Sequence, residues 1–243
     1  MENIKKIIDG KKYSEKFLKQ VYPLSTNFYK KFNRKPCLAV ILVGDNTASG
    51  IYVKNKVHTA EKNGIKSVKV ILSNKVSEAN LLNEILKLNE DQNIDGILVQ
   101  LPLPVHISEK KIIHSINPMK DVDGFHPINF GKLFMGDPNF VPCTPLGCYY
   151  MLKNELKELS GKNAVIIGRS NIVGKPMASL LLASNCSVTI THSKTKNLRE
   201  HCKKADILIS AVGIPEMVDE TYVKHNAIII DVGINRLQFV NSE

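Results

Sequence analysis

The chain has 243 residues, of which 43% are hydrophobic and 23% are charged, as in ordinary folded globular proteins. Its longest apolar runs, such as Cys37–Val43, fall far short of the roughly 18 residues of a membrane span, and we expect no signal peptide. The formal net charge is +10, but the lysines are spread along the chain and aromatic residues are only 6%, which argues against a nucleic-acid partner. The charge is typical of a lysine-rich surface, and it also favours attraction of anionic small molecules.

Cysteine and histidine spacing gives no sign of a disulfide framework or a metal site. The five cysteines are an odd number and include no C-x-x-C pair. We therefore expect reduced thiols in a cytoplasmic protein. The seven histidines form no H-x-x-x-H group, and the paired carboxylates Asp121 and Asp123 lack a partner at ligand spacing, so we expect no metal.

Short apolar runs rich in β-branched residues alternate with helical patterns along the whole chain. The runs are nearly continuous rather than alternating, which is typical of parallel strands with helices on both faces. This pattern predicts α/β architecture. The expected strands are Cys37–Val43, Val68–Leu72, Gly96–Leu101, Ala164–Ile167, Ser187–Ile190, Asp206–Ser210 and Ala227–Val232.

A glycine loop, residues 44–49, follows the first strand and leads into a helix that carries Ser49, Tyr52 and Lys56. At 100° per residue these three side chains fall within about 60° of one another around the helix. A phenol one turn from a lysine that burial has pushed toward neutrality is a plausible proton-transfer unit. The helix also carries other lysines, so the helix alone favours a surface position for Lys56.

Gln100 lies at the carboxyl edge of the expected strand Gly96–Leu101, and the prolines that follow prevent the strand from continuing. An uncharged amide at this edge suits the binding of a polar heterocycle and favours a site next to Lys56. The same amide also suits the capping of a neighbouring loop.

From Asn117 to Cys143 the alternation fails, and glycines and prolines punctuate what we expect to be a long irregular stretch that crosses an interdomain cleft. A carboxylate in this stretch, such as Asp123, can pair with the amidine-like edge of a pterin. Helix signals follow, with Thr144 as the expected N-cap and Pro145 at the first helical position. We place the domain boundary at Leu146, giving domains 1–146 and 147–243.

The strand Ala164–Ile167 runs into a glycine turn, Gly168–Gly174, and then into a helix. A strand, a glycine turn and a helix N-terminus together present free N–H groups to a pyrophosphate. The spacing is not the strict G-x-G-x-x-G, and the turn alone gives about even odds of nucleotide binding. The surrounding α/β pattern raises those odds.

The end of the next strand indicates which dinucleotide binds. NAD-specific sites place a carboxylate about 20 positions after the glycine turn to bind the ribose 2′-hydroxyl. Residues 191–194 read Thr-His-Ser-Lys and contain no carboxylate. Arg169 and Lys194, with the hydroxyls of Ser170 and Ser193, offer positive charge and donors to a 2′-phosphate, so we expect NADP rather than NAD. The bland alternative is that both cations face solvent.

Two later strand ends, Ser210–Gly213 and Asp231–Asn235, place small residues at the carboxyl edge of the second sheet. Backbone can approach a ligand closely at such positions, so these segments are candidates to line the nicotinamide side. The same glycines are equally typical of simple turns.

Six motifs in one order resemble the bifunctional methylenetetrahydrofolate dehydrogenase/methenyltetrahydrofolate cyclohydrolase family, often called FolD. The resemblance extends from Ile8 to Arg236. It implies two three-layer α/β domains flanking a cleft, the C-terminal one a Rossmann-type dinucleotide-binding domain. The motifs are Tyr52-x-x-x-Lys56, Val99-Gln-Leu-Pro-Leu-Pro104, Lys120-Asp-Val-Asp-Gly-Phe125, Pro142-Cys-Thr-Pro145, Gly168-Arg-Ser-x-x-Val-Gly174 and Asp231-Val-Gly-Ile-Asn235.

The resemblance implies NADP-dependent oxidation of 5,10-methylenetetrahydrofolate to the methenyl form and its hydrolysis to 10-formyltetrahydrofolate, in one-carbon metabolism. Lys56 is implied as the principal catalytic residue, with Tyr52 and Gln100 positioning it and the folate. A homodimer is implied as well. The implied folate contacts are Ser49, Tyr52, Lys56, Val99, Gln100, Leu101 and Asp123, and the implied NADP contacts are Gly168, Arg169, Ser170, Ser193 and Ile234.

The chain departs from the family at its end. Family members continue into a Pro-Gly-Gly-Val-Gly-Pro segment and a final helix, whereas this sequence ends at Glu243. We expect a truncated product with weaker folate binding and domain packing, and with dinucleotide binding less affected. The alternatives are a dehydrogenase without cyclohydrolase activity and a chain that binds dinucleotide without turnover.

Overall fold

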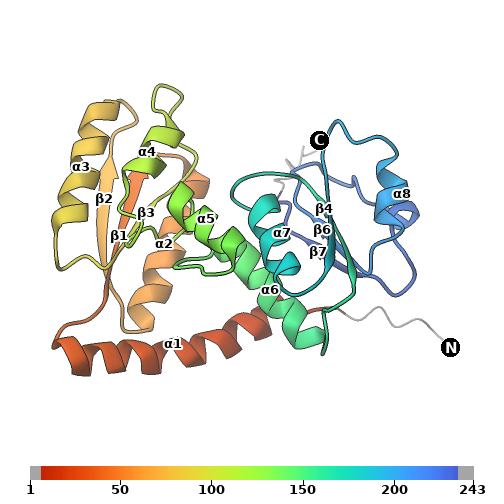
Figure 1. Ribbon diagram of the computed structural model, residues 1–243. Helices are drawn as coiled ribbons and strands as arrows, with labels where there is room; N and C mark the ends of the chain where they lie inside the picture. The colour runs from red at the N-terminus through yellow and green to blue at the C-terminus, as the bar shows by residue number, and fades with distance from the viewer. Residues whose placement is uncertain (1–6, 235–243) are drawn as a thin grey trace, which may run out of the picture. The chain divides into compact units, whose positions relative to one another are not determined.

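The computed structural model describes residues 7–234, and the chain divides into two compact units, Met1–Gly131 and Lys132–Glu243. Each unit contains its own parallel sheet with helices packed against it (Figure 1). This arrangement confirms the α/β class expected from the sequence. Of the helices described, none is long and apolar enough to cross a bilayer.

The N-terminal unit contains a three-stranded sheet of order β2-β1-β3 in which both strand pairs are parallel. Its register pairs Ala39 of β1 with Val68 of β2 and with Ile97 of β3. The elements in chain order are α1 (Gly10–Phe32), β1 (Cys37–Val43), α2 (Thr47–Lys62), β2 (Lys66–Leu72), α3 (Glu78–Glu90), β3 (Gly96–Val99) and α4 (Glu109–Ser115). Helix α5 (Pro127–Met135) follows and contains the unit boundary.

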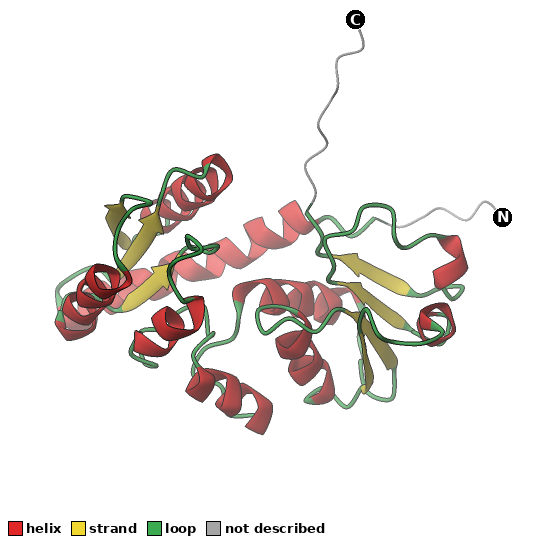
Figure 2. Cartoon of the chain, turned by 90° about the horizontal axis from the view of Figure 1, so that it is seen from above, coloured by secondary structure: helices red, strands yellow, loops and turns green. Residues whose placement is uncertain are grey.

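Apolar side chains on the two faces of this sheet belong to separate core clusters, so the unit has three layers. Ala39, Ile41 and Ile97 pack on one face with residues of α3 and α4 such as Ile85 and Ile112. The other face packs against α2 through Val40 and Leu98, which meet Val53 and Val57. Helices flank the strands on both sides (Figure 2). Helix α2 is therefore fixed on the sheet by its apolar side, and its polar side is left for chemistry.

The C-terminal unit contains a four-stranded parallel sheet of order β5-β4-β6-β7. This order, with the first strand of the unit inside the sheet, is that of a Rossmann-type fold. The elements are α6 (Cys143–Glu155), β4 (Asn163–Ile167), α7 (Gly174–Leu182), β5 (Ser187–Thr191), α8 (Leu198–Cys202), β6 (Ile207–Ser210), η1 (Glu220–Tyr222) and β7 (Ile228–Asp231).

This second sheet is also covered on both faces. Ala164 and Ile166 of β4 pack with Leu152 of α6 and Met177 of α7. On the opposite face Val165 packs in one cluster with Cys202 of α8. The three layers hold the carboxyl ends of β4 and β6 side by side, since Ile167 pairs with Ser210.

Three of the four edge strands differ from the fully covered strands that the sequence pattern suggested. The central strands β1, β4 and β6 are almost entirely buried, and so is the edge strand β3, whose outer side pairs with the segment at Asp121. The edge strands β2, β5 and β7 each carry exposed side chains. Ile71 in β2 is 69% exposed. An edge strand has one neighbour and less helix over it, so an apolar run does not distinguish it from a central strand.

Two expectations for residues 117–145 were wrong. The stretch is not irregular throughout, because α5 begins at Pro127, where the fixed φ of proline suits a first helical position. The next helix, α6, begins at Cys143 with Pro142 as its N-cap, so Thr144 is not the cap. Pro145, expected at the first helical position, is the third residue of α6, still within the first turn, where its missing N–H costs no helical hydrogen bond.

Candidate active site

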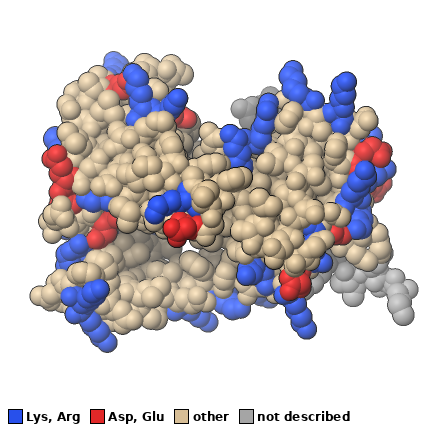
Figure 3. Space-filling view, viewed as in Figure 1, with Lys and Arg blue, Asp and Glu red and all other residues tan. Residues whose placement is uncertain are grey.

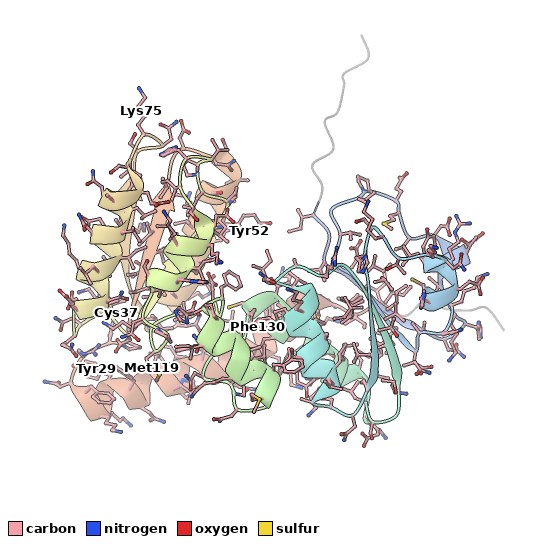
Figure 4. The ribbon with its side chains drawn as sticks, turned by 45° about the horizontal axis from the view of Figure 1, so that its top comes forward. Tyr29, Cys37, Tyr52, Lys75, Met119 and Phe130 are labelled. Atoms are coloured by element: carbon pink, nitrogen blue, oxygen red, sulfur yellow. The ribbon has the colours of Figure 1, made fainter. Side chains whose placement is uncertain are left out.

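The candidate site includes polar side chains at the start of helix α2. Gly44 leaves β1 with φ of 85°, a conformation that favours glycine, and Asn46 then caps α2 by accepting the Ser49 N–H at 3.0 Å. Ser49 is only 5% exposed, whereas Tyr52 is 46% exposed and projects from the surface of the unit (Figure 4). The start of α2 therefore presents the Tyr52 phenol to solvent above a buried serine.

Lys56 and Gln100 come together although α2 and β3 are far apart in sequence. The Lys56 Nζ donates to Gln100 Oε1 at 3.2 Å, and Gln100 Nε2 donates to the Leu101 carbonyl oxygen at 2.7 Å. The backbone N–H of Gln100 donates to the Ile41 oxygen at 2.9 Å, which continues the sheet for one more bond. The amide is thereby oriented with its oxygen toward the lysine. Both roles considered for Gln100, site residue and loop cap, are compatible with this geometry.

Asp123 adds a carboxylate to the same unit. Burial raises the pKa of Asp123 to about 6, the Lys56 ammonium opposes that shift, and the nearby Asp121 carboxylate adds to it. A carboxyl group with this pKa changes its charge close to neutral pH. Lys56 thus hydrogen-bonds to Gln100 and interacts electrostatically with Asp123.

The remaining predicted folate contacts, Val99 and Leu101, flank Gln100 in sequence. The Val99 side chain is 5% exposed and belongs to the core between the sheet and helices α3 and α4. Leu101 is partly buried against the same core. These side chains are committed to packing, so the backbone is what they can offer to a substrate.

Lys120, which fixes the segment before Asp123, is a residue to which the sequence assigns no role. The Lys120 Nζ donates to the carbonyl oxygens of Leu88, Asn89 and Asp91 at 3.1, 2.7 and 2.8 Å, at the end of α3. The Lys120 carbonyl accepts the Ile97 N–H at 2.6 Å, which attaches the segment to β3. A lysine at a helix C-terminus is a recognisable signal only once the contact is known, because its partners lie about 30 positions away.

The glycine turn of the C-terminal unit lies where β4 and β6 end. Gly168 has φ of 118°, and a Cβ there would lie 2.5 Å from the Ala211 carbonyl oxygen. A Cβ on Gly174 would overlap the carbonyl oxygen of Gly168. Strands β5 and β6 lie on opposite sides of β4, and open α/β sheets bind ligands where the strand order reverses in this way. The turn therefore fits a dinucleotide pyrophosphate.

Ser170 has a structural contact in this turn. Its Oγ accepts the N–H groups of Val173 and Gly174 at 3.1 and 3.3 Å, which orders the approach to α7. The hydroxyl hydrogen is left for another acceptor. This arrangement is compatible with the expected cofactor contact and gives Ser170 a second function in holding the turn.

The end of β5 carries no carboxylate, and its polar groups fit a phosphate. The buried Thr191 Oγ1 donates to the Ile166 oxygen at 3.0 Å, and the turn after it is closed by the His192 N–H donating to Thr195 Oγ1 at 2.9 Å. Ser193 and Lys194 are exposed at this turn. Among the residues described, neither Lys194 nor Arg169 has an ion-pair partner, so both cations are free for an anion.

Ile234 is the last described residue and is 74% exposed. The turn before it is ordered, because the Gly233 N–H donates to Asp231 Oδ1 at 2.9 Å and a Cβ on Gly233 would lie 2.6 Å from the Val212 oxygen. Asn235 of the last motif, Arg236 at the end of the resemblance, and the chain end where we expected truncation lie outside the described residues.

Within residues 7–234 no group of three or more His, Cys, Asp or Glu side chains is placed to hold a metal ion. A hollow of about 500 Å³ between β2 and α3 contains none of the predicted site residues. On the face shown in Figure 3, Lys and Arg side chains are scattered, with Asp and Glu among them.

A Rossmann-type unit with a glycine turn, joined in one chain to a unit that gathers a lysine, an amide and a carboxylate, defines a two-domain dinucleotide-dependent enzyme. Residues 8–123 match the catalytic domain of tetrahydrofolate dehydrogenase/cyclohydrolase, and residues 142–242 match its NAD(P)-binding domain. The chain belongs to this tetrahydrofolate dehydrogenase/cyclohydrolase family.

Relatives and solved structures agree with this assignment. The bifunctional protein FolD of Pelagibacter ubique (strain HTCC1062) is 52% identical over 232 residues, which are 96% of this chain and 83% of that protein. The crystal structure of the bifunctional FolD enzyme of Campylobacter jejuni has a TM-score of 0.92 and 47% identity, over 96% of this chain and 83% of that one. The Trypanosoma brucei enzyme, solved with NADP cofactor and inhibitor, has a TM-score of 0.89 and 33% identity, over 94% and 78%.

Proposed function

We propose that Lys56 is the principal catalytic residue of this enzyme, with Tyr52 and Gln100 positioning it and the folate. The enzyme oxidises 5,10-methylenetetrahydrofolate to the 5,10-methenyl form with NADP and hydrolyses that product to 10-formyltetrahydrofolate. The observation that carries the role of Lys56 is its 3.2 Å hydrogen bond to Gln100, which holds the ammonium group at the carboxyl edge of the sheet.

Hydrolysis is the step that needs a proton-transfer group. Water adds to the methenyl carbon and loses a proton, and the carbon–nitrogen bond then breaks as its nitrogen gains one. A lysine at hydrogen-bonding distance can accept that proton in its neutral amine form and return it from the ammonium form that results. Gln100 limits the directions in which Lys56 can point, and the exposed Tyr52 phenol supplies a donor toward the substrate.

Asp123 is the proposed anchor of the pterin. The ring N–H and the amino group of the pterin lie side by side on one edge and both donate hydrogen bonds. The Asp123 carboxylate can accept both. Ser49, Val99 and Leu101 are proposed to complete the folate site, the last two through their backbones.

NADP supplies the hydride acceptor when it is bound. Gly168 is proposed to hold its pyrophosphate at the turn before α7, where backbone can approach closely. The 2′-phosphate is proposed to bind to Arg169, Lys194, Ser170 and Ser193. Ile234 is proposed to contact the nicotinamide side. The protein's part in the oxidation is to align the methylene carbon with the cofactor.

Two alternatives are disfavoured. A dehydrogenase without cyclohydrolase activity has no need of the Lys56–Gln100 pair, and relatives at about half identity are named bifunctional. A chain that only binds dinucleotide has no need of the coupled Asp123 and Lys56. The expected weakening of folate binding at the chain end remains a prediction.

The test is turnover of methylenetetrahydrofolate, followed by the absorbance of the methenyl product, with NADP or NAD and with Lys56→Met alongside. We expect NADP-dependent turnover in both proteins and loss of cyclohydrolase activity in the variant. Hydrolysis at the unmodified rate by Lys56→Met would remove Lys56 from the mechanism.

The remaining assignments follow from the family resemblance. We propose a cytoplasmic homodimer with a folate-binding domain of residues 1–146 and an NADP-binding domain of residues 147–243. Sedimentation equilibrium at micromolar concentration measures the oligomeric state, and a monomer there would contradict the dimer.

A further inference from the structure

The turn that presents Asp123 begins at a second carboxylate, Asp121. The Gly124 N–H donates to the Asp121 carbonyl oxygen at 3.1 Å, so Asp121 and Gly124 are the first and fourth residues of the turn and Asp123 is the third. Gly124 has φ of 66°, a left-handed conformation that favours glycine. The backbone of Asp121 therefore sets the direction in which the Asp123 carboxylate points.

Two hydrogen bonds from residues after the turn fix the side chain of Asp121. It is 1% exposed, and its Oδ2 accepts the His126 N–H at 2.8 Å and the Asn129 Nδ2 at 2.9 Å. His126 immediately precedes α5, and its ring Nδ1 accepts the Ile128 N–H at 3.2 Å. One carboxylate oxygen thus ties the turn to the start of the helix that follows it.

Asn129 joins Asp121 to the segment before the turn. It is 0% exposed, and its Nδ2 also donates to the Pro118 carbonyl oxygen at 2.8 Å, while its Oδ1 has no hydrogen-bond partner. Rotating the amide would place its oxygen against two acceptors, so the observed orientation is fixed. A buried oxygen without a partner destabilises the fold, and the two donor contacts of Nδ2 offset that cost. Asn129 is therefore held in place by its hydrogen bonds, including the one to Asp121, and not by packing alone.

We propose that Asp121, together with Asn129, is a positioning residue for folate binding: the buried pair fixes the turn that places the Asp123 carboxylate against the pterin. The inference rests on the proposed role of Asp123 as the pterin anchor. Both side chains direct their hydrogen bonds to the protein itself, so neither is a catalytic residue.

Asp121 also acts on Asp123 through its charge. The charged groups that face Asp123 are Lys56 from α2 and Asp121 from its own turn, and the pKa of Asp123 is raised by burial first and by Asp121 in addition. Removing the Asp121 charge while keeping its shape should therefore lower the pH at which Asp123 ionises.

The test compares Asp121→Ala, Asp121→Asn and Asn129→Ala with the unmodified enzyme by dehydrogenase kinetics. The alanine variants lose the contacts to Oδ2, whereas the amide oxygen introduced by Asp121→Asn can accept the same two N–H groups. We expect the alanine variants to raise the KM for folate about 10-fold or more, with a smaller change in kcat, since small misplacements are costly. We expect the NADP KM to stay within about twofold and Asp121→Asn to recover most of the folate affinity.

A folate KM unchanged in folded Asp121→Ala would overturn the proposal, and so would an Asp121→Asn variant as impaired as Asp121→Ala. If the alanine variants do not fold, the pH profile of folate kcat/KM in Asp121→Asn decides. We expect its acidic limb, which reports Asp123, to move to lower pH, and an unmoved limb would contradict the coupling. Asp137→Asn, which removes an exposed carboxylate, controls for net charge.

Asp123→Asn separates this inference from the proposed function. An unchanged folate KM in Asp123→Asn would remove the pterin anchor itself. A raised KM in Asp123→Asn with a normal KM in Asp121→Ala would leave the proposed function intact and reject only the positioning role.

Discussion

Lys56 Nζ and Gln100 Oε1 form a hydrogen bond of 3.2 Å between residues 44 positions apart, one on a helix and one at the end of a strand. The bond joins the two elements that carry the proposed proton-transfer chemistry. Gln100 can make it because its own Nε2 is occupied by the Leu101 oxygen.

Replacing Gln100 with methionine should slow hydrolysis more than oxidation. The variant keeps the side-chain length but removes the acceptor, so Lys56 is no longer held in one direction. We expect the cyclohydrolase kcat to fall roughly 10- to 100-fold, about 1.4–2.7 kcal/mol of activation free energy. The cyclohydrolase kcat is measured by following the hydrolysis of methenyltetrahydrofolate. A Gln92→Met variant, changed at an exposed glutamine, is the matched control. Equal loss in both variants would contradict the specific role.

Asp123 should make the free energy of unfolding fall as pH rises from about 4 to about 6. Its pKa is about 6 in the folded chain against about 3.9 in an unfolded one, so the native state binds the proton more tightly. The stabilising contribution is complete below about pH 4 and is lost as pH rises through about 6, by about 3 kcal/mol at most. Chemical denaturation of the unmodified protein and Asp123→Asn should diverge between these values in favour of the variant. Parallel stability profiles would show that the carboxyl group is not perturbed.

Gly174→Ala should damage the dinucleotide turn. The added Cβ would overlap the Gly168 carbonyl oxygen, which belongs to backbone and can move only with the turn. We expect a loss of about 1–3 kcal/mol in the free energy of unfolding and weaker NADP binding by fluorescence titration. Gly147→Ala in α6 is the control, because nothing lies within 4 Å of its added Cβ and the helix should gain about 0.5–1 kcal/mol. A Gly174→Ala variant with normal stability and NADP affinity would contradict the close approach.

Arg169 should determine the preference for NADP over NAD. Arg169→Ala removes a cation without an ion-pair partner in the described structure, and a charge-assisted bond to phosphate contributes about 1.5–3 kcal/mol. We expect the KM for NADP to rise roughly 10- to 100-fold with little change for NAD. Arg199→Ala, whose guanidinium lies over the Tyr222 ring, serves as a control outside the turn. An equal loss of both cofactors would assign Arg169 to the pyrophosphate instead.

One thiol should react much faster than the other four. Cys143 is exposed, and the remaining cysteines are buried. Burial raises the pKa of Cys202 to about 11 and raises the pKa of Cys37, Cys148 and Cys186, which leaves less of the reactive thiolate. Titration with a coloured thiol reagent should give one fast equivalent in the native protein and none in Cys143→Ser. Two or more fast equivalents would contradict the burial of the other thiols.

The sequence was informative wherever one local pattern decides the structure. Every expected strand is present, because continuous apolar runs bounded by glycines and prolines favour buried parallel strands. The helix that carries Tyr52 and Lys56 was also predictable from its spacing. The start of α6 was not, because Thr144 is a residue typical of an N-cap, whereas the helix begins one residue before it, at Cys143, without a side-chain cap bond from Pro142.

The anchoring of the site could not be predicted for a different reason. Asp121 and Asp123 are two positions apart in one motif, yet one is committed to internal hydrogen bonds and the other faces Lys56. Their partners, Asn129 and Lys56, come from different helices, and no periodicity indicates which carboxylate each one meets. The residue types indicated the chemistry of the site. Only the three-dimensional contacts show which carboxylate is structural and which one faces Lys56.

The candidate residues for folate lie between Ser49 and Asp123, and those for NADP lie between Gly168 and Ile234, so the two sets share no segment of sequence. Substitutions from residue 168 onward can therefore change the dinucleotide preference during evolution and leave the residues of the hydrolytic reaction unaltered. The reverse also holds, because the loss of one lysine on α2 would leave the nucleotide half intact. Two linked reactions can in this way follow separate evolutionary histories within one gene.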